Sequence, residues 1–169
     1  GREIPAIPFG TGSLGHGLSL AAGLALAGRF GARRRQVYCV VSDGDCNEGS
    51  TWEAAMGASH HRLSNLTAMV DINALQADGP TAGVLRTEPV PDKWAACGWH
   101  VQRVDGNDVD ELLGAFDSVS TEQPSVILCD TRIGKGVPLL ETREKAHFMR
   151  IDADEWQKAH DMLDAAQPK

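Results

Sequence analysis

Apolar residues recur along this chain with two different spacings. Short, nearly unbroken apolar runs are typical of buried parallel strands, and they occur at residues 36–42, 66–71, 100–104 and 125–130. Longer stretches with helical spacing predict helices at residues 14–30, 51–61, 91–97, 108–119 and 151–166. The alternation of strand and helix predicts an α/β fold in which helices flank both faces of a parallel β-sheet. We expect one domain over residues 1–169.

Two of the predicted helices carry more specific expectations. The helix at 51–61 places one face on Trp52, Ala55, Met56 and Ser59. Asp108 stands where a side-chain oxygen can cap the helix that follows it.

Polar residues follow two neighbouring strands at the point where each strand ends. Asp43-Gly44 follows the first strand and Asn73 the second, 30 positions after Asp43. That distance leaves room for one crossover helix between adjacent parallel strands, whose carboxyl ends then meet at one edge. Asp43, Asn73 and a backbone carbonyl near Leu75 could supply three oxygen ligands to Mg²⁺. A diphosphate and water could complete its shell.

A glycine-rich turn precedes the first predicted helix. Gly10, Gly12 and Gly15 formally match a dinucleotide-binding fingerprint. However, Pro8 interrupts any strand upstream, and Gln36 stands where an acidic residue would be expected. The turn is therefore predicted to receive a flat ligand or an anion against its backbone.

The charge, the cysteines and the apolar content of the chain limit the kinds of partner and compartment that we expect. A formal net charge of −7 argues against nucleic acid as the main partner. The four cysteines form no Cys-x-x-Cys pair, and Cys39 and Cys129 lie in apolar runs, which favours small buried thiols in a reduced, cytoplasmic protein. The sequence has no apolar stretch long enough to span a membrane, so we expect no membrane partner.

Taken together, these motifs resemble the diphosphate-binding domain of the transketolase family, a group of thiamine-diphosphate enzymes. The resemblance covers nearly the whole chain in the family's order, through segments 11–17, 43–49, 52–56, 60–66, 71–73, 78–79 and 134–137, followed by His147. It implies the thiamine-diphosphate-binding fold and a cofactor of thiamine diphosphate with Mg²⁺ or Ca²⁺.

The resemblance also implies roles for particular residues at the metal and diphosphate end. Asp43, Asn73 and the Leu75 carbonyl would hold the metal. The Gly44 N–H and His147 would face the diphosphate, and His147 would also be catalytic.

Other roles implied by the resemblance lie at the ring end and at the subunit interface. Gly12 and Leu14 would offer backbone to the aminopyrimidine ring, while Glu48 would join a catalytic carboxylate network between subunits. Two residues depart from the family pattern: Ser42 stands where Gly is common, and His16 where Gln is common.

The family also has parts that this sequence lacks: an upstream helical region, a pyrimidine-binding domain with the activating glutamate, and a C-terminal domain. We therefore expect either a portion of a longer protein or the N-terminal subunit of a split enzyme. The second reading requires a partner polypeptide that carries the pyrimidine-binding and C-terminal domains, in a two-fold heteromeric assembly. It is favoured by the polar helix that ends the sequence.

The activity implied by the resemblance is transfer of a two-carbon ketol unit from a ketose donor, a sugar or sugar phosphate, to an acceptor. Three alternatives remain open at this point. One is the first component of a 2-oxo acid dehydrogenase, another is a hybrid that passes a two-carbon unit to a lipoyl carrier, and the third is a non-catalytic scaffold subunit.

Overall fold

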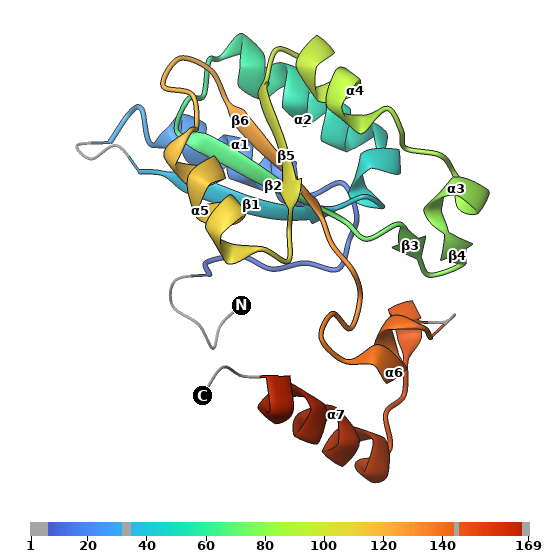
Figure 1. Ribbon diagram of the computed structural model, residues 1–169. Helices are drawn as coiled ribbons and strands as arrows, with labels where there is room; N and C mark the ends of the chain where they lie inside the picture. The colour runs from blue at the N-terminus through green and yellow to red at the C-terminus, as the bar shows by residue number, and fades with distance from the viewer. Residues whose placement is uncertain (1–6, 32–34, 144–145, 167–169) are drawn as a thin grey trace.

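A four-stranded parallel sheet forms the centre of the molecule (Figure 1). The computed structural model describes residues 7–31, 35–143 and 146–166. The strands of this sheet lie in the order β1-β2-β6-β5 and comprise β1 Val37–Ser42, β2 Leu66–Ile72, β5 His100–Asp105 and β6 Ser125–Asp130. All four lie where the sequence pattern predicts a strand. The parallel pairing confirms the predicted sheet.

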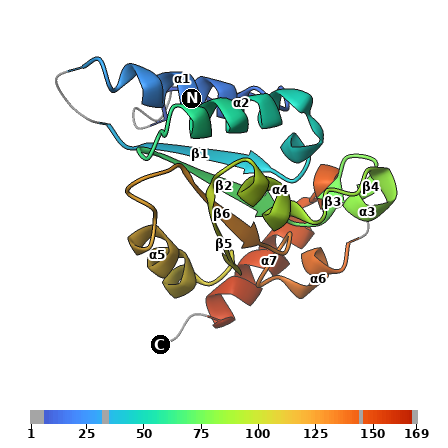
Figure 2. The same cartoon turned by 90° about the horizontal axis from the view of Figure 1, so that it is seen from above.

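Helices cover both faces of the sheet (Figure 2). The α-helices are α1 Gly17–Ala27, α2 Gly49–His60, α3 Thr81–Val84, α4 Val90–Ala96, α5 Val109–Asp117, α6 Pro138–Glu141 and α7 Ala153–Ala166. Two single 3₁₀ turns are η1 Asp45–Asn47 and η2 Ala146–Phe148. Helices α1, α2 and α4 lie over one face, and α5 lies over the other. The predicted α/β class is thus confirmed.

Strand β6 explains why an unbroken apolar run was the right signal for a central strand. Val126 and Leu128 point into the core beneath α1, α2 and α4, whereas Ile127 and Cys129 point toward α5. All four are buried, because a central parallel strand has no solvent-facing side. Cys39 is buried as well, so both thiols that were expected in the core are there.

The buried face of α2 differs from the prediction. Thr51, Ala55 and Ala58 are buried, whereas Met56 is 55% exposed. These three follow the i, i+4, i+7 spacing of one helix face. The large side chains of Trp52 and Met56 suggested the wrong stripe, because close packing beneath this helix favours its small residues.

Helix ends follow the local chemistry of the chain. Asp108 accepts hydrogen bonds from the N–H groups of Asp110 and Glu111 at 2.9 and 3.1 Å, which confirms the predicted cap. Helix α1 is shorter than residues 14–30, since Gly15 has a φ of +78° and the turn through it occupies the residues before Gly17.

A small antiparallel hairpin was not predicted at all. It pairs β3 Leu75–Gln76 with β4 Gly79–Pro80 and leads into α3. In Figures 1 and 2 this unit stands beyond the carboxyl ends of the parallel strands. None of the helices in the described part of the chain is both long and apolar enough to cross a membrane.

Candidate functional site

The candidate site lies where β1 and β2 end side by side. Ser42 pairs with Asp71 in the parallel register, and the Asp43 N–H donates to the Asp71 carbonyl at 3.0 Å. The strand pairing therefore brings Asp43 and Asn73 to the same edge, although 30 residues separate them in sequence. This is the edge at which parallel α/β sheets bind ligands.

The Asp43 carboxylate is buried and only 2% exposed. Its Oδ2 accepts a hydrogen bond of 2.8 Å from the Thr81 hydroxyl. Burial raises the pKa of Asp43 above its usual range. The nearby charge of Asp71 raises it further, against the lowering effects of Thr81 and of the Gly44 and Ala74 N–H groups. A carboxylate whose charge is disfavoured in this way is stabilised by a bound cation.

Asn73 is held in one orientation by its neighbours. Its Nδ2 donates to Asp71 Oδ2 at 3.1 Å, and its Oδ1 accepts from the Leu75 N–H at 3.0 Å. The other Asp71 oxygen accepts a hydrogen bond from the Thr131 hydroxyl, so a residue at the end of β6 fixes this group from the far side. The result is an amide oxygen turned away from Asp71 and toward the start of the hairpin.

Thr81 connects the two halves of this arrangement. Its hydroxyl reaches Asp43, while its N–H donates to the Ala74 carbonyl at 2.9 Å. The hairpin turns the chain back so that Thr81 returns to Ala74, the residue just before Leu75. The Leu75 carbonyl thus belongs to a segment that is fixed against Asp43.

The glycine turn lies against the same strand end. The Gly15 N–H donates to Asp45 Oδ1 at 2.8 Å, and Cδ1 of Leu14 lies 3.7 Å from the position that a Cβ on Gly44 would occupy. Gly12 is exposed, and no atom lies within 4 Å of the Cβ it could carry. The structure therefore places Leu14 beside Gly44 and leaves open space at Gly12.

Glu48 stands at the start of α2. It is exposed, and its side chain makes no capping hydrogen bond to that helix. Its Cβ lies 2.8 Å from the position that a Cβ on Gly15 would occupy. The base of its side chain thus lies next to the turn, and its carboxylate does not cap the helix.

His147 reaches this region from the other end of the chain. It lies exposed on η2, which packs against β3, and its ring meets that of Phe148 edge-on at 4.9 Å between centroids. The structure therefore brings His147 close to the Leu75 segment, as a residue that faces a ligand there would need to be.

Cys46 lies three residues after Asp43, and a cysteine thiol near a site can act as a nucleophile. This one does not. Burial raises the pKa of its thiol to about 12, so the thiol stays protonated at neutral pH. It packs in the main core together with the small residues of α2.

The donor set fits a magnesium ion that shares its shell with a diphosphate. Among the described residues, no three His, Cys, Asp or Glu side chains gather closely enough to hold a metal by themselves. One carboxylate, one amide oxygen and one carbonyl are, however, what Mg²⁺ takes from a protein when phosphate and water supply the remaining ligands. Asp43, Asn73 and Leu75 are the residues that would hold it.

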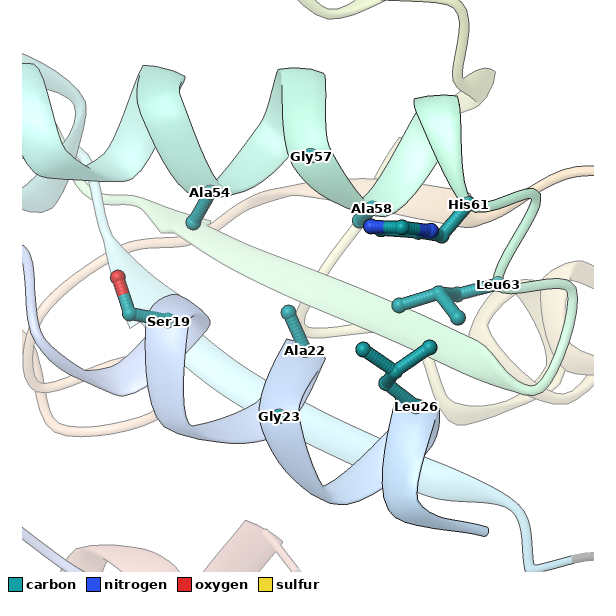
Figure 3. Close-up of a pocket in the computed structure, with 9 residues that line it drawn as sticks. All are labelled: Ser19, Ala22, Gly23, Leu26, Ala54, Gly57, Ala58, His61 and Leu63. Carbon is teal, nitrogen blue, oxygen red and sulfur yellow. The ribbon is translucent and has the colours of Figure 1, made fainter. Parts of the chain in front are cut away.

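A separate groove runs between α1 and α2 (Figure 3). It has a volume of about 210 Å³, and its lining is almost entirely apolar, with Ala22, Leu26 and Leu63 among the contributors. None of the residues predicted for the cofactor lines it. Its lining includes no carboxylate or amide side chain of the kind that Mg²⁺ takes, so the strand ends remain the candidate site.

Sequence reasoning missed three residues that organise the site, namely Thr81, Asp71 and Asp45. The Asp78-Gly79 pair is a hairpin signal that could have revealed the return of the chain to Thr81. Asp71 ends the second predicted strand, where its side chain gives no sign in sequence that it orients Asn73. Nothing near Asp45 in the sequence indicates that its partner is Gly15.

Comparison with known proteins places this geometry in a family. The family described as "Transketolase, thiamine diphosphate binding domain" matches residues 2–168. An uncharacterized transketolase family protein from Sinorhizobium fredii is 50% identical over 164 residues, which cover 95% of this chain and 59% of that protein. A 6-deoxy-6-sulfo-D-fructose transketolase subunit from Clostridium sp. is 41% identical over 94% of this chain and 58% of its own length.

A solved structure agrees with these sequence matches. The transketolase from Campylobacter jejuni superposes with a TM-score of 0.84 at 29% identity, over 91% of this chain and 26% of that one. The chain thus spans about three fifths of the two curated relatives named above. It belongs to the transketolase family, and nearly its whole length matches that family's thiamine diphosphate binding domain.

Proposed function

We propose that this chain is the diphosphate- and Mg²⁺-holding part of a transketolase that moves a two-carbon ketol unit from a ketose donor to an acceptor. The observation that supports this most is the placement of Asp43 and Asn73 just after two adjacent, paired strands, with Thr81 fixing the hairpin against Asp43. Bound thiamine diphosphate would supply a carbanion that the side chains of a protein cannot provide.

The residues of this chain would bind and orient that cofactor. Asp43, Asn73 and the Leu75 carbonyl would hold the metal. The Gly44 N–H and His147 would face the diphosphate. Gly12 and Leu14 would lie against the ring, and the exposed Glu48 would meet a carboxylate network from another subunit.

A second polypeptide or domain is part of this proposal. Glu48 is assigned to the interface network, so the glutamate that activates the cofactor must come from another polypeptide or domain. The Clostridium relative is named as a transketolase subunit, and its name includes the sugar 6-deoxy-6-sulfo-D-fructose. We infer a sugar or sugar-phosphate donor and a two-fold assembly with a chain that carries the pyrimidine-binding and C-terminal domains.

Donor cleavage tests this proposal. The 169-residue chain is assayed with thiamine diphosphate, Mg²⁺ and a ketose, alone and then with the product of the neighbouring reading frame, and the mixture is sized by light scattering. We expect turnover only in the mixture, together with a heteromeric particle. Robust turnover by the chain alone would contradict the need for a partner.

A further inference from the structure

Asp45 is a buried acidic residue that the proposed chemistry does not use. Asp45 lies three residues after the end of β1, at the start of η1, and it is only 9% exposed. None of the ion pairs found among the described residues involves it. A buried carboxylate without a cation needs several hydrogen-bond donors to remain stable, so its partners indicate what it holds in place.

Both oxygens of Asp45 have such donors. Oδ1 accepts from the Gly15 N–H at 2.8 Å. Oδ2 accepts from the Ser42 N–H at 2.8 Å and from the Ser42 hydroxyl at 2.9 Å. One side chain thus joins the glycine turn to the strand end that carries Asp43.

Further contacts fix the turn around this link. The Ser50 hydroxyl donates to the Gly15 carbonyl at 3.0 Å, and the Thr51 hydroxyl donates to the Asp45 carbonyl at 2.7 Å. A Cβ at Gly15 would lie only 2.3 Å from Ser50 Oγ, so the turn is seated closely on the start of α2. The position of the turn relative to Asp43 is therefore set by Asp45 and its two partners, together with the contacts from the start of α2.

We propose that Asp45, together with Ser42, is a positioning residue that holds the glycine turn in register with the metal and diphosphate site. This inference rests on the proposed function. An extended cofactor that is bound at both ends binds best when the two binding sites in the protein are already at the right separation. Here these are the glycine turn, which would contact the ring, and the metal and diphosphate site. Asp45 itself touches neither end, because Gly15 and Ser42 occupy its oxygens.

A positioning role makes a prediction that a general structural role does not. Loss of Asp45 should weaken binding of a ligand that contacts both the glycine turn and the diphosphate site. It should not affect binding of a ligand that contacts the diphosphate site alone. Thiamine diphosphate spans both, whereas inorganic pyrophosphate reaches only Asp43, Asn73 and the groups around them. The two ligands therefore separate the roles.

The experiment titrates thiamine diphosphate and inorganic pyrophosphate, each with Mg²⁺, into the natural full-length protein with any subunit that copurifies. Asp45→Ala and Asp45→Asn are compared with wild type, because Asn keeps one acceptor oxygen but sets an N–H against a donor. We expect at least about a ten-fold loss of thiamine diphosphate affinity, from the hydrogen bonds to a charged group that are lost. Pyrophosphate affinity should stay within about two-fold of wild type, since the ligands of that end are untouched.

Ser42→Ala provides a milder variant should the Asp45 variants fail to fold. It removes one hydroxyl and keeps both N–H bonds to Asp45, so it should show the same split at a smaller size. Equal losses for both ligands, or no loss for thiamine diphosphate, would overturn the positioning role. If the wild type binds neither ligand, the proposed function itself is wrong, and the role of Asp45 falls with it.

Discussion

The Thr81 hydroxyl donates a 2.8 Å hydrogen bond to Oδ2 of Asp43. Its N–H donates to the Ala74 carbonyl, so the β3–β4 hairpin and the predicted metal ligand are fixed by one residue. Thr81 therefore holds the Asp43 carboxylate in one orientation relative to the hairpin.

Replacing Thr81 by Val should therefore weaken binding of thiamine diphosphate and Mg²⁺ while preserving shape. A hydrogen bond to a charged group contributes about 1.5–3 kcal/mol, which corresponds to about a ten-fold or greater loss of affinity. Thr81→Ser restores the hydroxyl and should restore binding. Calorimetric titration measures both variants, and equal affinity in Thr81→Val and wild type would show that Asp43 does not need this donor.

His147 should act on the cofactor more than on the sugar, because η2 packs against the hairpin that contains Leu75. His147→Ala is expected to raise the Kd for thiamine diphosphate several-fold and to leave the sugar KM nearly unchanged. Phe148→Ala is the matched control, since Phe148 is the next residue in the same turn and is 76% exposed. A change in sugar KM with unaltered cofactor binding would place His147 at the substrate instead.

Asp43 should destabilise the metal-free protein at neutral pH. Burial raises its pKa, so the folded state binds that proton more tightly than the unfolded state does. The resulting stability is present below the unfolded pKa of about 3.9 and is lost as pH rises through the folded value. Asp43→Asn should thus unfold at higher temperature than wild type in EDTA at pH 7, and this advantage should shrink as the pH is lowered.

The order of melting temperatures of wild type and Asp43→Asn should reverse when cofactor is added. Thiamine diphosphate with Mg²⁺ should raise the melting temperature of wild type strongly and that of Asp43→Asn little, because a ligand stabilises only the state that binds it. If Asp43→Asn is less stable than wild type in EDTA at pH 7, burial of this carboxylate is not costly in the folded state.

Gly15 should tolerate an added side chain poorly. It has a φ of +78° and lies against Ser50, so Gly15→Ala is expected to lower the free energy of unfolding by about 1–3 kcal/mol. Gly114 lies inside α5 with no atom within 4 Å of an added Cβ, and Gly114→Ala should raise stability by about 0.5–1 kcal/mol. Denaturant unfolding compares the two, and similar values would mean that the turn is not tightly held.

The sequence predicted the sheet and the meeting of Asp43 with Asn73 because both depend on strong local signals. Unbroken apolar runs mark β1 and β2, and a polar residue at the end of each must reach the same edge once the strands pair. Thr81 was missed because strands of two residues are too short to show a period. The link from Asp45 to Gly15 was missed because it joins segments 30 residues apart with no local pattern.

The buried face of α2 shows a different limit. Trp52 and Met56 dominate any estimate from hydrophobicity, yet the close approach of α2 to α1 and the sheet favours Ala55 and Ala58. Small residues give a weak periodic signal in sequence, and their burial follows from how closely the elements pack.

The most direct test of the central claim is calorimetric titration of thiamine diphosphate into the natural full-length protein, with and without Mg²⁺, for wild type and Asp43→Ala. Asp43 is a strand-end residue outside the apolar core, so the far-UV circular dichroism of the variant should stay near that of wild type. We predict tight binding by wild type that requires the metal, and severely weakened binding by Asp43→Ala. Equal affinity in the two proteins would contradict the assignment of Asp43 to the metal.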